Sequence, residues 1–253
     1  MAARGRVVIG TSGWSYPHWV GPFYAPGTSS SDFLPAYAQR FAASEVNTTF
    51  YQLPARETLD HWLAQTPADF IFACKASRYI THVKKLKDPE RSTARFFDAI
   101  ARLGGRLGPV LFQLPPNWRP NPERLAAFLA ALPAGYRYVF EFRDPRWFTE
   151  AVYALLAEVK AGLVIADMAG ETSPVHVTAD LVYLRLHGPG ETPYTGSYSD
   201  AALDDWAEHV RDWNAAGRDV YVFFDNDAGG NAPADALRLK ARLDTSSVHG
   251  PLA

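Results

Sequence analysis

Short β-rich runs alternate with helical patterns along almost the whole chain, and this alternation constrains the fold more than any other feature. Between most of the runs, apolar residues recur three and four positions apart, as in ARFFDAIARL, which is the pattern of a helix with one buried face. We predict eight strands, at Val7–Gly10, Glu45–Thr49, Phe70–Lys75, Val110–Gln113, Tyr138–Phe142, Leu163–Asp167, Leu181–Leu186 and Val220–Phe224.

Eight strand–helix units in 253 residues match the size of a (β/α)8 barrel. We therefore expect an α/β fold with a single-domain TIM-like barrel over residues 1–243 and a flexible tail at residues 244–253. The sixth unit is irregular, because the segment MAGETSPVHVTAD before the seventh strand has no helical pattern. A doubly wound open sheet is the alternative.

The composition favours a cytoplasmic protein that does not enter a membrane. The formal net charge of −2 gives no overall attraction to nucleic acid or acidic lipid. The single cysteine, Cys74, cannot form a disulfide within the chain, and it falls on the strand face turned toward the helices. We find no signal peptide and no apolar run of the roughly 18 residues that a membrane span needs.

The predicted strands become polar on one face toward their carboxyl ends. In VYLRLHG, Tyr183, Arg185 and His187 alternate with apolar residues, so they share one face of the strand. In a barrel, the inward-facing polar ends of parallel strands meet at the mouth, where active sites are built. We therefore expect a functional site there, although a polar layer satisfied by internal hydrogen bonds is the alternative.

Three carboxylates are the candidate catalytic groups. Glu45 and Glu141 end the second and fifth strands on the inward face, so they can lie across the mouth and divide acid and base roles. Asp167 closes the sixth strand and is assigned to orienting water or a metal. The alternative is structural ion pairing of Glu45 with Lys75 and of Glu141 with Arg143 or Arg185.

Cationic and amide side chains at the same strand ends predict an anion-binding site. Arginine can bind a phosphate or carboxylate through two hydrogen bonds. The loop DNDAGGN adds backbone N–H groups at a position where barrels often bind phosphate. That loop is otherwise a simple glycine turn. The candidate substrate- or anion-binding residues are Lys75, His82, Arg143, Arg185, His187, Asn226 and Asp227.

The cofactor requirement stays open at this level. Carboxylates and histidines on several strands allow a divalent metal, but they lack a compact ligand spacing. We see no organic cofactor motif, and the sequence does not give the oligomeric state.

Aromatic residues follow several strands, beginning with the loop GTSGWSYPHWVGPFYAPG behind the first one. Such rings can stack on sugars or bases, and we predict an aromatic rim of Trp14, Tyr51, Trp147 and Tyr194. Alternatively, Trp14 and Trp19 fold down as a hydrophobic cover, so the sequence leaves open whether the mouth is accessible or plugged.

Several stretches together resemble the DUF72 (YecE-like) family. They run in order from Gly10 to Ala236 and include EVNTTFYQLP, FACKASRYITHVKKL, LGPVLFQLPPNW, FEFRDPRWF, YLRLHG and FFDNDAGGNAPADA. The resemblance implies a TIM-barrel-like fold and leaves the chemistry open. Asp144 and Asp225 depart from the family pattern, which often has histidine and asparagine at these positions.

These features favour a hydrolase or lyase that acts on an anionic, ring-bearing ligand, such as a sugar phosphate or a nucleotide-derived ester. A glycosidase-like enzyme acting on neutral sugars would keep the carboxylates and make the cations structural. A third interpretation is a barrel that binds nucleic acid or a small ligand without catalysis. The basic segment RYITHVKKLKD, with Arg78, Lys84, Lys85 and Lys87, favours that interpretation.

Overall fold

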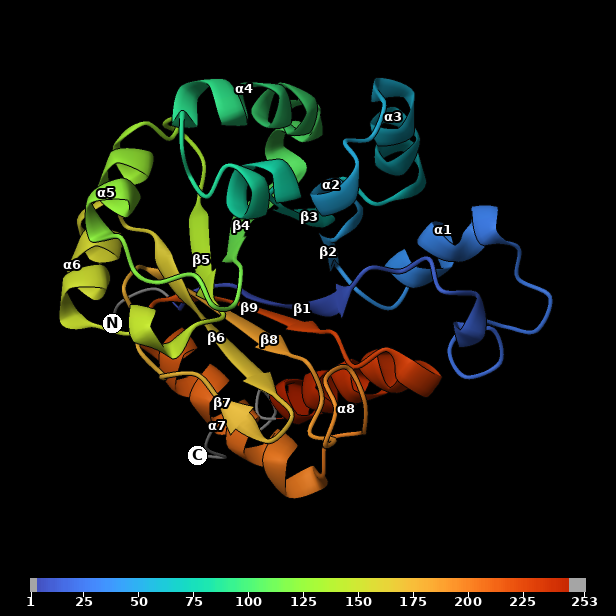
Figure 1. Cartoon of the computed structure of the whole chain (residues 1–253). Helices are drawn as coiled ribbons and strands as arrows, with labels where there is room; N and C mark the ends of the chain where they lie inside the picture. Colours follow the sequence, from blue (N-terminus) through green and yellow to red (C-terminus); the bar gives the residue numbers. More distant parts are fainter. Residues whose placement is uncertain (1–3, 246–253) are drawn as a thin grey trace.

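The computed structural model describes residues 4–245, and eight parallel strands close into a barrel within them (Figure 1). The strand order is β5-β4-β3-β2-β1-β9-β8-β6, and pairing of β6 with β5 completes the ring. The predicted TIM-like barrel is therefore confirmed. The barrel strands are β1 (Val7–Ser12), β2 (Ala43–Val46), β3 (Ile71–Lys75), β4 (Leu107–Leu114), β5 (Tyr138–Phe142), β6 (Gly162–Met168), β8 (Leu181–Leu186) and β9 (Asp219–Phe224).

Helices cover the outside of this ring, and α7 and α8 lie side by side (Figure 1). The first βα connection contains a short helix that the sequence pattern did not reveal, because only six residues of it are helical. The helices are α1 (Phe33–Ala38), α2 (Thr48–Tyr51), α3 (Arg56–Gln65), α4 (Pro89–Ile100), α5 (Pro122–Ala130), α6 (Glu150–Glu158), α7 (Asp200–Ala215) and α8 (Asn231–Thr245).

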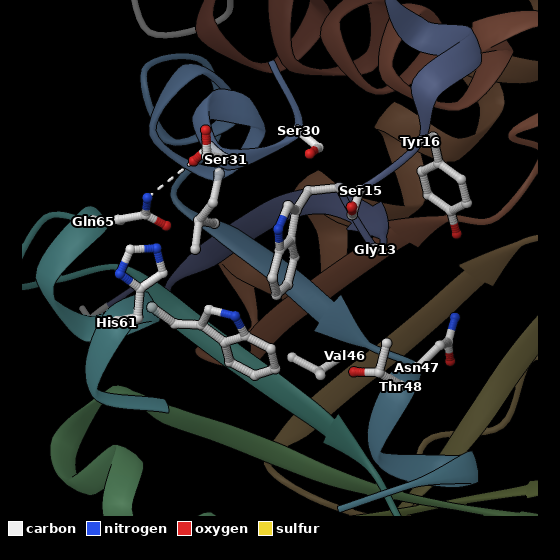
Figure 2. Close-up of a pocket in the computed structure, with 13 residues that line it drawn as sticks. Gly13, Ser15, Tyr16, Ser30, Ser31, Val46, Asn47, Thr48, His61 and Gln65 are labelled. Atoms are coloured by element: carbon white, nitrogen blue, oxygen red, sulfur yellow. Dashed lines mark hydrogen bonds between the residues drawn. The ribbon is translucent and has the colours of Figure 1, made fainter. Parts of the chain in front are cut away.

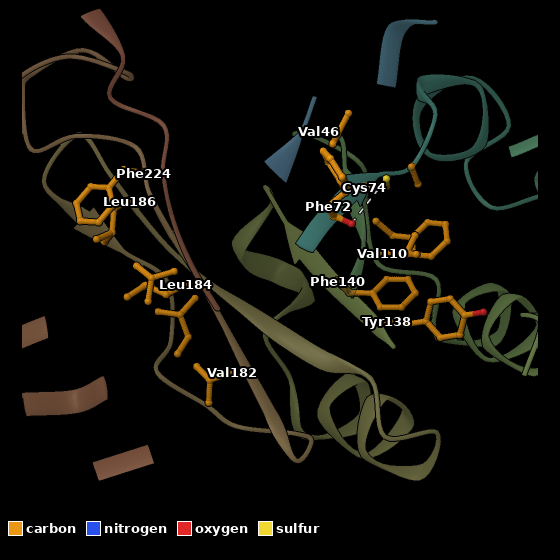
Figure 3. Packing of buried hydrophobic residues seen from close by; sticks show 14 of the residues in the cluster. Val46, Phe72, Cys74, Val110, Tyr138, Phe140, Val182, Leu184, Leu186 and Phe224 are labelled. Carbon is orange, nitrogen blue, oxygen red and sulfur yellow. Dashed lines mark hydrogen bonds between the residues drawn. The ribbon is translucent and has the colours of Figure 1, made fainter. Parts of the chain in front are cut away.

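The two faces of each strand bury two different sets of side chains. Val182, Leu184 and Leu186 belong to the large outer core beneath the helices, and Figure 3 shows them with other members of that layer. Tyr183 and Phe223, which have the opposite parity, belong to a smaller core inside the barrel. This division follows from the alternation of side chains along a strand, and it turns the polar strand ends inward.

The sixth unit is irregular, as predicted. Its segment forms a two-residue antiparallel strand, β7 (Glu171–Thr172), that pairs back onto β6, and the described connection contains no helix. Ala169 and Gly170 have φ values of 53° and 78°, so the chain reverses through left-handed backbone directly after β6.

Several element boundaries differ from the sequence prediction, most clearly at the end of β2 and at the start of the tail. β2 ends at Val46 rather than at Thr49, and α2 begins at Thr48. The Thr49 hydroxyl lies 2.8 Å from the Val46 carbonyl and 2.7 Å from the Lys75 carbonyl, which satisfies backbone acceptors that a longer strand pairing would use. The first two residues of the predicted tail belong to α8, and residues 246–253 lie outside the described residues.

Over residues 4–245, no helix has both the length and the apolar character that a membrane crossing requires.

Candidate active site at the barrel mouth

Arg185 stands at the centre of the barrel interior, at the carboxyl end of β8. It donates from Nε to Glu45 Oε2 at 2.9 Å and from Nη2 to Glu45 Oε1 at 2.6 Å. It also donates to Glu141 Oε2 at 2.8 Å and to Asp225 Oδ2 at 3.0 Å. One guanidinium therefore links carboxylates that come from β2, from β5 and from the end of β9.

Glu45 has no free hydrogen-bonding capacity in this arrangement. Besides the two bonds from Arg185, its oxygens accept from Ser12 Oγ and from the Tyr183 hydroxyl, each at 2.7 Å. Its side chain is fully buried. A carboxylate that accepts four hydrogen bonds is held in one position, and this favours a structural role over proton transfer.

Glu141 is shared by two arginines. Arg143, two residues further along, pairs with Glu141 Oε1, while Arg185 binds Oε2. Burial raises the pKa of the Glu141 carboxyl, but Arg143 and Arg185 outweigh it and hold that pKa well below its usual range. Glu141 is therefore ionised at neutral pH.

His187 bridges the same groups through its two ring nitrogens. Arg143 Nη2 and Arg185 Nη1 each lie 3.1 Å from Nε2. Because both guanidiniums are donors, Nε2 must be the unprotonated acceptor, and Nδ1 carries the proton 3.1 Å from Asp225 Oδ2. Burial and Arg185 lower the pKa of the imidazole, which fixes it in this neutral form. We call Arg185, Glu45, Glu141, Asp225 and His187 the polar hub.

Lys75 ends β3 beside the hub and is bound differently. Its Nζ lies 4.6 Å from the centroid of the Phe50 ring, and over the described residues this ammonium forms no ion pair or side-chain hydrogen bond. Burial and the nearby Arg185 lower the pKa of Lys75 to about 8, against the opposing effects of Glu141 and Glu45. The amine is thus the cation at the mouth that is free to act on a ligand.

His82 lies next to Lys75, on a π-helical turn over Tyr79–Val83. Its ring packs edge-on against Phe50 at 5.0 Å, and Nδ1 lies 2.9 Å from the Thr81 hydroxyl. Burial and Lys75 lower the pKa of His82, so its half-buried imidazole is neutral at neutral pH. It can offer a ring nitrogen to a ligand without adding charge.

A family model described as "Protein of unknown function DUF72" matches residues 8–252. The chain belongs to the DUF72 family. It is 26% identical to the UPF0759 protein YunF of Bacillus subtilis, over 94% of this chain and 95% of that one. The UPF0759 protein YecE of Escherichia coli K12 is 34% identical over 57% of this chain and 51% of its own length.

Solved structures of the DUF72 family have the same fold. A family member from Thermotoga maritima is 31% identical and superposes with a TM-score of 0.86, covering 94% of this chain and 99% of the other. A member from Enterococcus faecalis is 20% identical, with a TM-score of 0.81 over 94% and 95% of the two chains, and it supports the fold alone.

Two residues of the predicted site lie apart from the hub. Asn226 points away from the barrel interior, since its parity is opposite to that of Asp225, and it donates to Gly196 O and Asp235 Oδ2 at 2.8 and 2.9 Å. Asp167 accepts from the Tyr198 hydroxyl at 2.6 Å and from Thr172 at 2.7 Å. Both side chains therefore hold loops in place.

Asp227 lies at the edge of the mouth. Its carboxylate is about one-quarter exposed and lies 3.8 Å from His18 Nε2. Burial and the charge of Asp225 raise the pKa of this carboxyl, so it protonates more readily than an isolated aspartate.

The predicted aromatic rim divides into two groups. Tyr51 and Tyr194 are 80% and 43% exposed, and the Tyr194 ring covers His187 at 5.5 Å. Trp147 is instead fully buried, stacked on Phe142 at 5.0 Å, because a position after a strand can also face the outer core. Trp14 packs outside the barrel, against Trp62. The rim at the mouth thus consists of tyrosines rather than tryptophans.

The loop behind β1 is a cover over the outer core. Trp19 is fully buried among Tyr16, Phe23 and Tyr24, and it belongs to the outer core rather than to the barrel interior. Gly13 has a φ of 89°, and a Cβ there would lie 3.0 Å from the Tyr16 hydroxyl, so this turn needs glycine.

Asp225, Ser12 and Tyr183 are not among the site residues predicted from the sequence. Asp225 continues the inward parity of Tyr221 and Phe223, and this alternation could have identified it as a site residue. The signal was obscured because Asp225 stands in a run of three polar residues, DND. Ser12 and Tyr183 bind Glu45, and no local pattern specifies such a pairing between distant strands.

Among residues 4–245, no group of three or more histidine, cysteine, aspartate or glutamate side chains has the arrangement of a metal site.

Proposed function

We propose that the mouth of the barrel is the active site of a hydrolase or lyase. Its substrate is an anionic, ring-bearing molecule such as a sugar phosphate or a nucleotide-derived ester. The observation that carries this proposal is the partly buried Lys75 amine, which over the described residues forms no ion pair or side-chain hydrogen bond beside the hub. A partly buried cation that touches no counter-ion directly is costly, so a protein retains one chiefly where it serves a ligand or a reaction.

Lys75 is the proposed proton-transfer group. With a pKa of about 8, a substantial fraction of the amine is neutral near physiological pH, and the two protonation states suit a base and an acid. In this proposal the ammonium form also attracts the anionic group of the substrate. In this proposal Arg143 and His82 supply further polar contacts to that group.

Glu45 and Glu141 are assigned positioning roles. Both are tied to Arg185, and Glu141 also pairs with Arg143, so neither is poised to exchange a proton. A glycosidase-like mechanism with Glu141 as the acid needs a raised pKa at that carboxyl, whereas the pKa of Glu141 is lowered. This argues for the anionic substrate over a neutral sugar.

The first experiment is a thermal-shift screen with phosphorylated sugars and nucleotides against their uncharged counterparts, with and without divalent metal. A ligand that binds the native state raises the melting temperature. Compounds that bind are then assayed for turnover with the wild type, with Lys75→Met and with Lys240→Met, a surface lysine on α8 as matched control. We expect Lys75→Met to abolish turnover and Lys240→Met to leave it unchanged. Retained turnover in Lys75→Met would refute the proposal.

A second candidate is binding of nucleic acid without catalysis. The segment after β3 exposes Arg78, Lys85 and Lys87, and Lys85, Leu86 and Asp88 have φ values between 49° and 64°. Strained backbone of this kind clusters at functional sites. Salt-dependent binding to an oligonucleotide, with no turnover of any compound in the screen, would favour this candidate.

A further inference from the structure

A side pocket of about 540 Å³ opens between the loop behind β1 and the helices α1 and α3. Figure 2 shows Gln65 next to Ser31, with His61 nearby, at one end of the pocket, and Tyr16 and Asn47 at the other. Of the described residues, thirteen line the pocket, and none of them is aspartate, glutamate, lysine or arginine. The pocket therefore suits an uncharged ligand group.

Two tryptophans form the apolar wall. Trp14 and Trp62 meet edge to face at 5.1 Å with their planes at 88°, and Trp62 stacks on Phe72 at 5.9 Å. The Tyr24 hydroxyl donates to the Trp14 carbonyl at 2.5 Å, which fixes the loop that carries Trp14. Rigid indoles bind a flat ring at little cost in conformational entropy.

Polar groups at the two ends of the pocket are partly unsatisfied. At one end, Gln65 Nε2 donates to the Ser31 carbonyl at 3.0 Å, which leaves the Gln65 amide oxygen to accept from a ligand. At the other end, Asn47 Oδ1 is buried and has no hydrogen-bond partner over the described residues. An apolar platform flanked by amide and hydroxyl groups recognises a ring that has a polar edge.

The pocket shares a wall with the barrel mouth. Tyr16 lines the pocket, and its hydroxyl donates to the Ser12 carbonyl at 2.7 Å. The hydroxyl of the same Ser12 donates to Glu45 of the hub. Burial and the charges of Asp225 and Asp227 raise the pKa of Tyr16, so the phenol stays protonated at neutral pH.

We propose that the side pocket is a second ligand site, which binds an uncharged ring, either a nucleobase or a sugar, against Trp14 and Trp62. This inference goes beyond the proposed function, because the pocket and the mouth lie on opposite sides of the Tyr16 wall. Lys75, at the mouth, takes no part in binding this ring.

The test uses uncharged probes, so that it does not depend on the anion site. Adenosine, uridine and methyl glucoside are titrated into protein containing 15N-labelled tryptophan, and the indole resonances of Trp14 and Trp62 are followed by NMR. We expect one class of probe to bind, with a Kd about tenfold weaker in Trp62→Leu, the effect of losing one stacking platform. His61→Ala should weaken binding as well, and it is a surface change that keeps the aromatic packing.

His209→Ala, an exposed histidine on α7, is the matched control and should leave binding unchanged. Lys75→Met should also retain binding of the uncharged probes, even though the proposed function requires it to lose turnover. The inference fails if no probe binds, if Trp62→Leu and His61→Ala bind like the wild type, or if Lys75→Met abolishes probe binding. If no probe binds, or if the two pocket variants bind like the wild type, the inference about the pocket fails but the proposal for Lys75 is unaffected. Failure of the pocket inference can therefore be told apart from failure of the proposed function.

Discussion

Arg185 Nη2 donates to Glu45 Oε1 at 2.6 Å, and both side chains are almost completely buried inside the barrel. Burial opposes the charge on Arg185, but Glu45 and Glu141 hold the pKa of the guanidinium well above its usual range. Arg185 therefore stays charged at neutral pH. The main function of the pair is to fix the relative positions of β2 and β8.

Replacing Arg185 should lower the free energy of unfolding more than replacing Glu45. Arg185→Met leaves Glu45, Glu141 and Asp225 facing one another, whereas Glu45→Gln leaves Arg185 with two carboxylates. Removing one partner of a buried pair costs about 3–5 kcal/mol, so we expect Arg185→Met to reach or exceed that range and Glu45→Gln to fall below it. Urea unfolding at pH 7 measures both. Arg102→Met, which breaks an exposed pair with Asp60, serves as the control, and equal losses in the two hub variants would contradict this ranking.

Lys75→Met should stabilise the protein at neutral pH. The pKa of Lys75 falls from 10.5 to about 8 on folding, so the unfolded chain binds more protons between these values, and the penalty is complete below pH 8. The gain should therefore be at most ~3 kcal/mol at pH 7 and should shrink as the pH approaches 10. Thermal unfolding of both proteins at the two pH values tests this. A gain that does not depend on pH would show that methionine packing, and not the titration of Lys75, is responsible.

Acid should weaken the wild type more steeply than Glu141→Gln. The folded-state pKa of Glu141 lies below its unfolded value of about 4.3, so its contribution to stability is present above that pH and is lost as the pH falls. Glutamine does not titrate, so the variant should be less stable at pH 7 but lose less between pH 5 and pH 3. Denaturant unfolding over this range compares the two slopes. Asp205→Asn, an exposed position on α7, should keep the wild-type slope.

Asp235 should control the loop between β8 and α7. Its buried carboxylate accepts from Ser197 Oγ, Tyr198 N and Asn226 Nδ2 at 2.7 to 2.9 Å, and from Arg238 at 2.7 Å. Asp235→Ala would leave two buried donors, Tyr198 N and Asn226 Nδ2, unsatisfied, at about 1–3 kcal/mol each. We expect faster chymotrypsin cleavage within residues 187–199 and a lower melting temperature. Unchanged cleavage would mean that other contacts hold the loop, and Asp205→Ala is the matched control.

The sequence was sufficient to predict the barrel because strand and helix periodicity are local and repeat along the whole chain. The inward direction of Glu45, Glu141 and Arg185 also follows from alternation within a strand. Their pairing does not, because it depends on how strands far apart in sequence are positioned around the ring. One alternative paired Glu45 with Lys75, whereas in the structure Glu45 binds Arg185 and leaves Lys75 unpaired.

The aromatic residues show the same limit. Trp147 and Tyr194 both follow strands, but one stacks on Phe142 in the outer core and the other covers His187 at the mouth. Whether a ring packs in the outer core or lies at the mouth depends on the geometry of its loop. The pattern of residues along the sequence does not contain that geometry. The side pocket went unpredicted for this reason, since Trp14 and Trp62 come from different βα units.

The hub also bears on how the barrel closes during folding. Arg185 finds its acceptors on β2, on β5 and at the end of β9, which together span both halves of the chain. A half-barrel built from the first four units would contain Glu45 without its guanidinium, and one built from the last four would contain Arg185 without Glu45. A partly assembled ring therefore has unpaired charges that destabilise it, and only closure of the barrel pairs them. The polar hub thus disfavours stable half-barrels during folding.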